Sequence, residues 1–199
     1  MKILFVSLGC DKNRVDTEVM LGALASHGYS FTDDEEEAEA AVVNTCCFIN
    51  DAKEESINTI LELSERRKSG QLQVLIVTGC LGQRYKDEIQ KEIPEVDEIL
   101  GISSTDKILT AIDETLKRNK LYTHKNYFDD LGKRPVGGQK RVITTGGLFN
   151  YLKIAEGCDK RCTYCIIPKV RGSYRSVPME ELIKEAKDLA QMGVTELLL

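Results

Sequence analysis

The sequence lacks any long hydrophobic segment. No apolar run approaches the roughly 20 residues that a membrane-spanning helix needs. The apolar start, Met1–Gly9, is too short for a signal peptide and is followed by no cleavage site. We therefore expect a cytoplasmic protein without membrane association. Histidine is also scarce, and both His27, at a predicted helix end, and His124, in a predicted linker, are expected to be surface residues rather than metal ligands.

Internal repeats and low-complexity tracts are absent as well. Hydrophobic residues make up 42% of the chain, so a sizeable core can be buried. Charge is unevenly distributed, because residues 1–116 are acidic and residues 117–175 are basic. The basic part either attracts an anionic partner or is a solvated linker, and for residues 117–141 we favour the linker.

What the sequence does contain is an alternation of strands and helices. Continuous apolar runs predict buried strands at 2–8, 29–32, 40–45, 74–78 and 96–100. Amphipathic segments between them predict helices at 16–26, 51–68, 84–93 and 106–117. Strands without polar alternation that are joined by helices indicate an α/β fold with a doubly wound parallel sheet, covered on both faces.

Residues 118–149 are rich in glycine and charge and break this alternation. It then resumes with a strand at 151–155, a long loop at 157–177, a helix at 179–192 and a strand at 195–199. We therefore divide the chain into an N-terminal domain at 1–118, a linker at 119–149 and the start of a second domain at 150–199. Because so short a second unit is not stable alone, we expect the chain to be a fragment.

Seven cysteines in a chain without an export signal favour metal or redox chemistry over disulfides. Cys158, Cys162 and Cys165 form a C-x3-C-x2-C loop that can wrap one soft metal centre. A structural zinc site needs a fourth ligand, which is not evident nearby, so zinc or chance clustering is the less favoured alternative. Three ligands on a four-iron cluster leave one iron open to bind a small molecule.

A second set of cysteines is dispersed. Cys10, Cys46 and Cys80 each follow a predicted buried strand. The carboxyl ends of parallel strands meet at one edge of the sheet, where ligand sites of open α/β sheets lie. We therefore expect these thiols to lie together, with Gly9 and Gly79 allowing close backbone approach. The alternative is that they are buried apolar cysteines.

Three further residues near these cysteines leave alternatives open. If the chain stays extended, Cys47 points away from Cys46, so we treat it as a spectator that can also substitute for its neighbour. Asn13 and Asp16 either orient the Cys10 loop or, for Asp16, cap the following helix. The cap is the interpretation that we favour.

The Cys158–Cys165 loop, with Tyr164 before its last cysteine, resembles the signature of the radical S-adenosylmethionine enzymes. The resemblance implies a full or partial β/α barrel, truncated here, with the loop after its first strand. It also implies that Cys158, Cys162 and Cys165 hold a 4Fe–4S cluster and that these residues and Tyr164 bind S-adenosylmethionine. The cluster would cleave this molecule to a 5′-deoxyadenosyl radical.

The N-terminal domain resembles that of the methylthiotransferases, on the segments Ser7–Asp16, Asn44–Cys46 and Thr78–Cys80. This resemblance implies that Cys10, Cys46 and Cys80 hold a second, auxiliary 4Fe–4S cluster. Ser7–Asp16 and Cys162–Ser176 resemble the ribosomal-protein branch of the family more than its tRNA branch. The departures are Asp11, where proline is common, and Cys47, where glycine is common.

The resemblance implies transfer of a methylthio group to the β-carbon of an aspartate in ribosomal protein S-twelve. An electron donor such as flavodoxin or ferredoxin would be a further partner. Lys169, Arg171 and Arg175 either contact the cofactor carboxylate or substrate, or belong to a solvated loop. The alternatives are a methylthiotransferase acting on tRNA adenosine and a non-enzymatic iron–sulfur carrier or scaffold, although a carrier normally has four cysteines per cluster. The 199-residue piece by itself is expected to be inactive.

Overall fold

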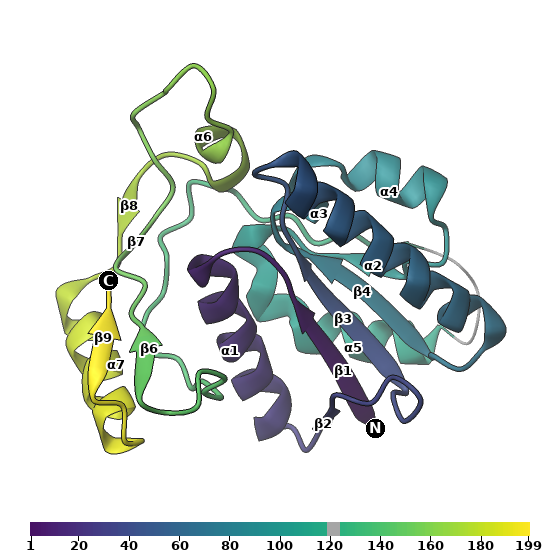
Figure 1. Ribbon diagram of the computed structural model, residues 1–199, viewed down its shortest axis with the longest axis horizontal. Coiled ribbons are helices and arrows are strands. Elements are labelled where there is room, and N and C mark those ends of the chain that lie inside the picture. The colour runs from purple at the N-terminus through teal and green to yellow at the C-terminus, as the bar shows by residue number, and fades with distance from the viewer. Residues whose placement is uncertain (119–123) are drawn as a thin grey trace.

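The computed structural model describes residues 1–118 and 124–199. Its larger part is built on a five-stranded sheet in the order β2-β1-β3-β4-β5, and every neighbouring pair is parallel (Figure 1). The strands are β1 (Lys2–Ser7), β2 (Ser30–Thr32), β3 (Ala40–Thr45), β4 (Val74–Thr78) and β5 (Glu98–Ile99). The predicted parallel sheet is confirmed, and its order changes direction between β1 and β3.

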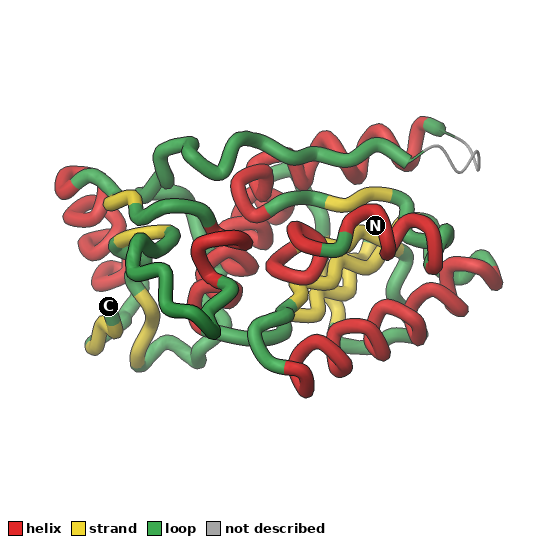
Figure 2. The backbone as a smooth tube through the Cα atoms, turned by 90° about the horizontal axis from the view of Figure 1, so that it is seen from above, coloured by secondary structure: helices red, strands yellow, loops and turns green. Residues whose placement is uncertain are grey.

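Helices cover both faces of this sheet (Figure 2). One face packs against α1 (Asp11–Ser26) and α5 (Ile108–Lys117), which follows the 3-10 helix η1 (Ile102–Lys107). The other face packs against α2 (Asn50–Ser69), α3 (Gly79–Arg84) and α4 (Lys86–Glu92). The sheet is therefore doubly wound, as predicted.

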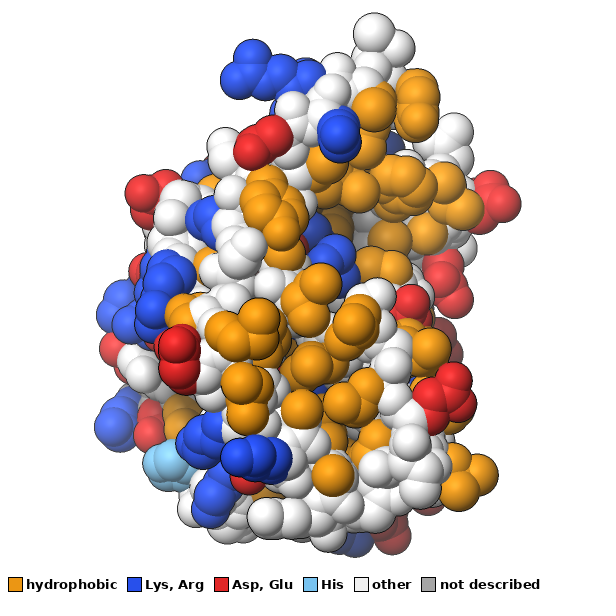
Figure 3. Space-filling view, turned by 90° about the vertical axis from the view of Figure 1, so that its left-hand side faces the viewer, with side chains coloured by type: hydrophobic (Ala, Val, Ile, Leu, Met, Phe, Trp, Pro, Cys, Tyr) orange, Lys and Arg blue, Asp and Glu red, His pale blue; other side chains and the backbone are white. Residues whose placement is uncertain are grey.

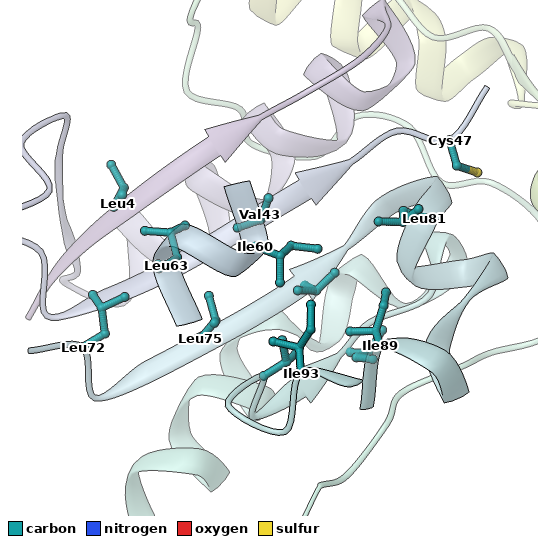
Figure 4. Close-up of a cluster of buried hydrophobic side chains, with 14 of the residues drawn as sticks. Leu4, Val43, Cys47, Ile60, Leu63, Leu72, Leu75, Leu81, Ile89 and Ile93 are labelled. Atoms are coloured by element: carbon teal, nitrogen blue, oxygen red, sulfur yellow. The ribbon is translucent and has the colours of Figure 1, made fainter. Parts of the chain in front are cut away.

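The central strands have no solvent-facing side. Every residue of β3 and β4 is buried, because alternate side chains enter the two hydrophobic clusters on opposite faces. The cluster under α2 and α4 is drawn in Figure 4, where Val43 and Leu75 of the sheet face Ile60 and Leu63 of α2. This burial explains why the strands read as continuous apolar runs.

The C-terminal part contains one strand–helix–strand unit. Strands β6 (Phe149–Tyr151) and β9 (Glu196–Leu198) pair in parallel, and α7 (Met179–Gln191) connects them. A short antiparallel pair, β7 (Ala155–Glu156) and β8 (Arg175–Ser176), flanks α6 (Ile167–Arg171). Hydrophobic side chains gather on the side of the molecule that this part forms (Figure 3), and Leu148, Met179 and Leu199 are more than half exposed.

Several predicted element boundaries were wrong. Helix α1 begins at Asp11 rather than residue 16. The helix predicted at 84–93 is α4, and the short helix α3 before it was not predicted. The helix predicted at 106–117 begins as the 3-10 turn η1, and the strand predicted at 151–155 is split into β6 and β7. In the first turns of α1 and in α3, polar residues or glycines hide the apolar periodicity that marks a helix.

In the part of the chain that the structure describes, no helix is long and apolar enough to cross a membrane.

A buried carboxylate in β5 makes the fold sensitive to pH. Glu98 has no exposed surface and pairs with Arg118 at 2.5 Å. Its Oε2 atom has no hydrogen-bond partner among the described residues. Burial raises the pKa of Glu98 to about 7, against the opposing effect of Arg118. The folded protein therefore holds a proton on Glu98 at pH values where the unfolded chain has lost it.

We expect the free energy of unfolding to fall by about 3 kcal/mol between pH 5 and pH 8, because a raised carboxyl pKa stabilises the fold only while the group is protonated. Glu98→Gln should remove most of this decline. Urea denaturation at several pH values measures it, with Glu88→Gln, on the exposed side of α4, as the matched control. Equal slopes for Glu98→Gln and the wild type would contradict the assignment.

Candidate functional site

Three neighbouring strands deliver cysteines to the same edge of the sheet. Ser7, Asn44 and Thr78 are aligned across β1, β3 and β4. A cysteine follows each of these residues within three positions. Cys10 is the N-cap of α1, Cys46 comes directly after β3, and Cys80 lies in the first turn of α3. We call Cys10, Cys46 and Cys80 the auxiliary thiols.

The auxiliary thiols line one cavity of about 720 Å³. It lies at the β1–β3 switch point, the usual ligand-binding position in open α/β sheets. Its walls come from the ends of β1 and β3, from α2 and α3, and from α6 of the C-terminal part. The residues on them include Leu8, Cys10, Cys46, Cys47, Phe48, Cys80, Ile166 and Arg171.

The expectation that Cys47 points away from the site was wrong. Cys47 is buried and lines the same cavity as Cys46, and Figure 4 places it at the end of the hydrophobic cluster beyond β3. The strand ends at Thr45, so the alternation of side chains no longer applies. The cavity therefore offers four thiols rather than three.

Two glycines permit the close approach of these loops, as predicted. A Cβ atom on Gly9 would lie 3.0 Å from the Cys46 Sγ atom, and one on Gly79 would lie 2.6 Å from the Thr45 nitrogen. Both have positive φ, +97° and +88° respectively, which disfavours any residue with a side chain.

Burial in the cavity keeps the Cys80 thiol protonated when no metal is bound. Burial raises the pKa of Cys80 to about 12, and the nearby Arg171 opposes this only in part. Burial also raises the pKa of Cys47. Because only thiolates bind metals well, loading of this site has to release protons.

Asn13 orients the Cys10 loop, whereas Asp16 does not cap the helix. The Asn13 amide nitrogen donates to the Leu8 carbonyl at 2.8 Å and to the Thr45 carbonyl at 2.9 Å. Asp16 lies inside α1, where it is buried and paired with Lys153 of the C-terminal part. The predicted cap was wrong because the helix begins five residues earlier.

The second cysteine set, which we call the loop thiols, comprises Cys158, Cys162 and Cys165. It lies in the connection between β7 and α6. The Cys165 N–H donates to the Cys162 carbonyl at 3.0 Å, which closes a turn. Cys162 is exposed, and the Tyr164 side chain is 87% exposed.

Both sets fit a thiolate-bound iron–sulfur cluster in their donor chemistry. Within the described ranges, however, no three metal-binding side chains lie close enough together to hold a single metal ion. The fold brings the auxiliary thiols into one cavity and the loop thiols into one loop without closing them on a centre. Cluster binding would complete the ordering of these segments.

Comparison with known proteins agrees with this architecture. Residues 2–101 match the family described as Uncharacterized protein family UPF0004, and residues 152–199 match the Radical SAM superfamily. A protein of Lachnoclostridium phytofermentans named "Ribosomal protein uS12 methylthiotransferase RimO" is 59% identical over all of this chain and 44% of its own length. Proteins of the same name from Acetivibrio thermocellus and Clostridioides difficile are 50% and 49% identical, over 100% and 99% of this chain and 44% of each relative.

The first match covers the α/β domain that holds the auxiliary thiols, and the second begins just before the loop thiols. The chain belongs to the UPF0004 family, and its C-terminal part carries a Radical SAM superfamily segment. Its similarity is to the RimO proteins in particular, and it spans about 44% of the length of these relatives.

Proposed function

We propose that this chain forms the cluster-binding part of a methylthiotransferase that modifies an aspartate β-carbon of a small-subunit ribosomal protein. The observation that carries the proposal is that the C-terminal part helps to form the cavity that holds the auxiliary thiols. Helix α6 directly follows the loop thiols, and its residues Ile167, Val170 and Arg171 form one wall of the cavity that holds the auxiliary thiols. The relatives are named for methylthio transfer to the ribosomal protein uS12.

Each thiol set would hold one 4Fe–4S cluster. Three thiolates leave one iron of such a cluster without a protein ligand, and the loop thiols with Tyr164 would bind S-adenosylmethionine. When bound, these groups supply the one-electron chemistry, the sulfur and the methyl group that the reaction needs. The protein's contribution is to hold the auxiliary thiols in a cavity with apolar walls from Leu8, Phe48 and Ile166, and to place the loop thiols directly before α6, which forms one of those walls.

The domain division belongs to the same proposal. We place the methylthiotransferase domain at 1–118, the linker at 119–149 and the radical SAM portion at 150–199, although 119–123 lie outside the described residues. A flavodoxin or ferredoxin would donate electrons, in the cytoplasm where ribosomes are made.

We expect Cys80→Ala and Cys158→Ala each to lose about half of the iron of the anaerobically reconstituted full-length enzyme, since each variant would disable one of two four-iron clusters. Iron and acid-labile sulfide analysis measures this loss. Cys47→Ala is the matched control, because its thiol lines the same cavity, and it should keep full iron. Zinc in place of iron, or loss of all iron in one single variant, would contradict the two-cluster assignment.

The substrate is tested by mass spectrometry of the purified ribosomal protein and of tRNA after incubation with the reconstituted enzyme. A methylthio mass increase on the aspartate-containing peptide supports the proposal. An increase on tRNA alone would assign the chain to the tRNA branch instead, and neither product despite S-adenosylmethionine cleavage would refute methylthio transfer.

A further inference from the structure

Arg171 is the last residue of α6 and belongs to the C-terminal part, but its guanidinium is buried against the N-terminal domain. The residue is only 3% exposed. Its Nη1 atom donates to both carboxylate oxygens of Glu156, at 2.9 and 3.0 Å, and its Nη2 atom donates to the Asn13 Oδ1 atom at 2.6 Å. One planar cation therefore joins two parts of the chain that are 158 residues apart.

On the N-terminal side, Arg171 is connected to the strand ends that carry the auxiliary thiols through the side chain of Asn13. Its partner Asn13 holds the carbonyls of Leu8 and Thr45, which lie within two residues of the first two auxiliary thiols. The third, Cys80, lines the same cavity as Arg171. Arg171 is thus bonded, through Asn13, to the segments that carry two of the auxiliary thiols and adjoins the cavity that contains the third.

On the C-terminal side, Arg171 is tied to the start of the loop thiols. Glu156, its carboxylate partner, lies two residues before Cys158. The Cys158 N–H donates to the carbonyl of Gly172, which adjoins Arg171, at 3.0 Å. A Cβ atom on Gly157 would lie 2.1 Å from the Ser173 carbonyl oxygen, so the two ends of the loop are in direct backbone contact.

Arg171 belongs to a group of paired charges in which its planar, forked guanidinium binds several partners at once. Lys153 pairs with both Glu156, at 3.1 Å, and Asp16, and the Arg171 Nη1 atom lies 3.5 Å from Asp16. Two cations and two carboxylates therefore lie together, and of these only Lys153 is partly exposed. A lysine in place of Arg171 keeps the charge but has no fixed fork to bind a carboxylate and an amide at once.

We infer that Arg171 is a positioning residue that fixes the auxiliary thiols and the loop thiols in one relative arrangement. The inference rests on the proposed function, in which both sets hold clusters that act on one substrate. Its physical basis is a buried cation whose partners lie beside both sets.

The first test uses the cluster-free chain and needs no activity. We expect amide hydrogen exchange to be about tenfold faster in Arg171→Gln at residues 9–13, 45–47 and 157–158, because hydrogen bonds to a buried charge are lost. The sheet core should be unchanged. The matched control is Arg134→Gln, which removes another ion pair between distant segments, with Glu181, at a side chain that is 64% exposed. Exchange as slow as in this control would overturn the inference.

The second test separates positioning from mere stability. In the reconstituted full-length enzyme, pulsed electron paramagnetic resonance measures the distribution of distances between the two reduced clusters. We expect Arg171→Gln to broaden it without loss of iron, and Arg171→Lys, which keeps the charge and the fold, to broaden it less. A distribution as narrow as the wild type's in both variants overturns the inference. A wild-type enzyme without a second cluster refutes the proposed function instead, and the exchange result then decides on Arg171 alone.

Discussion

Arg141→Ala is expected to weaken the attachment of the C-terminal part to α1 by about 3–5 kcal/mol, because it leaves buried carboxylates without their counter-ion. Arg141 bonds to Glu18 at 2.7 Å and to Glu185 at 2.7 Å, and the Arg141 and Glu18 side chains are 1% and 0% exposed. It also donates to the Asn150 side chain at 2.7 Å and to the Tyr151 carbonyl at 2.8 Å.

The loss is measured by urea denaturation together with hydrogen exchange at Val142, whose N–H donates to the Glu18 carbonyl at 3.0 Å. Arg134→Gln again serves as the control, because an exposed ion pair contributes about 1 kcal/mol or less. If Arg141→Ala lowered the free energy of unfolding by no more than this control, the bonds of Arg141 would contribute little to the attachment of the C-terminal part.

Gly79→Ala is the second substitution with a large expected effect, about 4 kcal/mol or more. The new methyl group would lie 2.4 Å from the Asn44 Oδ1 atom and 2.4 Å from the Thr45 carbonyl oxygen, at a φ of +88°. These neighbours are buried in the sheet edge and cannot retreat, so the chain before Cys80 has to move.

Gly70→Ala separates the two causes, because Gly70 has nearly the same φ, +86°, but no atom within 4 Å of its would-be Cβ. We expect it to cost about 1 kcal/mol, the backbone strain alone. Urea denaturation of both variants measures the difference. Similar decreases in the free energy of unfolding for the two variants would mean that the atoms around Gly79 move aside at little cost.

The parts of the fold that local pattern determines were predictable from the sequence. Strands β1, β3 and β4 are continuous apolar runs because both of their faces are buried. Parallel strands end at a common edge, and this alone was enough to predict that Cys10, Cys46 and Cys80 would line one place. Their role as cluster ligands remains a prediction.

What the sequence did not reveal depends on tertiary contacts. The first turns of α1 carry Asp11, Lys12, Asn13 and Arg14, which give no apolar signal, and its N-cap Cys10 makes no capping bond. Cys47 escaped prediction because the strand ends one residue before Cys46. Arg141 pairs with Glu18, 123 positions away, and Arg171 bonds to Asn13, 158 positions away, and no periodicity or spacing records such a pairing.

Helix α1 lies between the two parts of the molecule and contacts both of them. Its sixteen residues span about 24 Å, and a Cβ atom on Gly22, in the C-terminal half of the helix, would lie 2.2 Å from the Lys140 carbonyl oxygen. The segment around Lys140 is thus in close contact with α1 at Gly22 and bonded to it at Glu18, while the N-cap of the helix is Cys10. The helix that begins at the first auxiliary thiol is therefore also the one on which the C-terminal part is anchored.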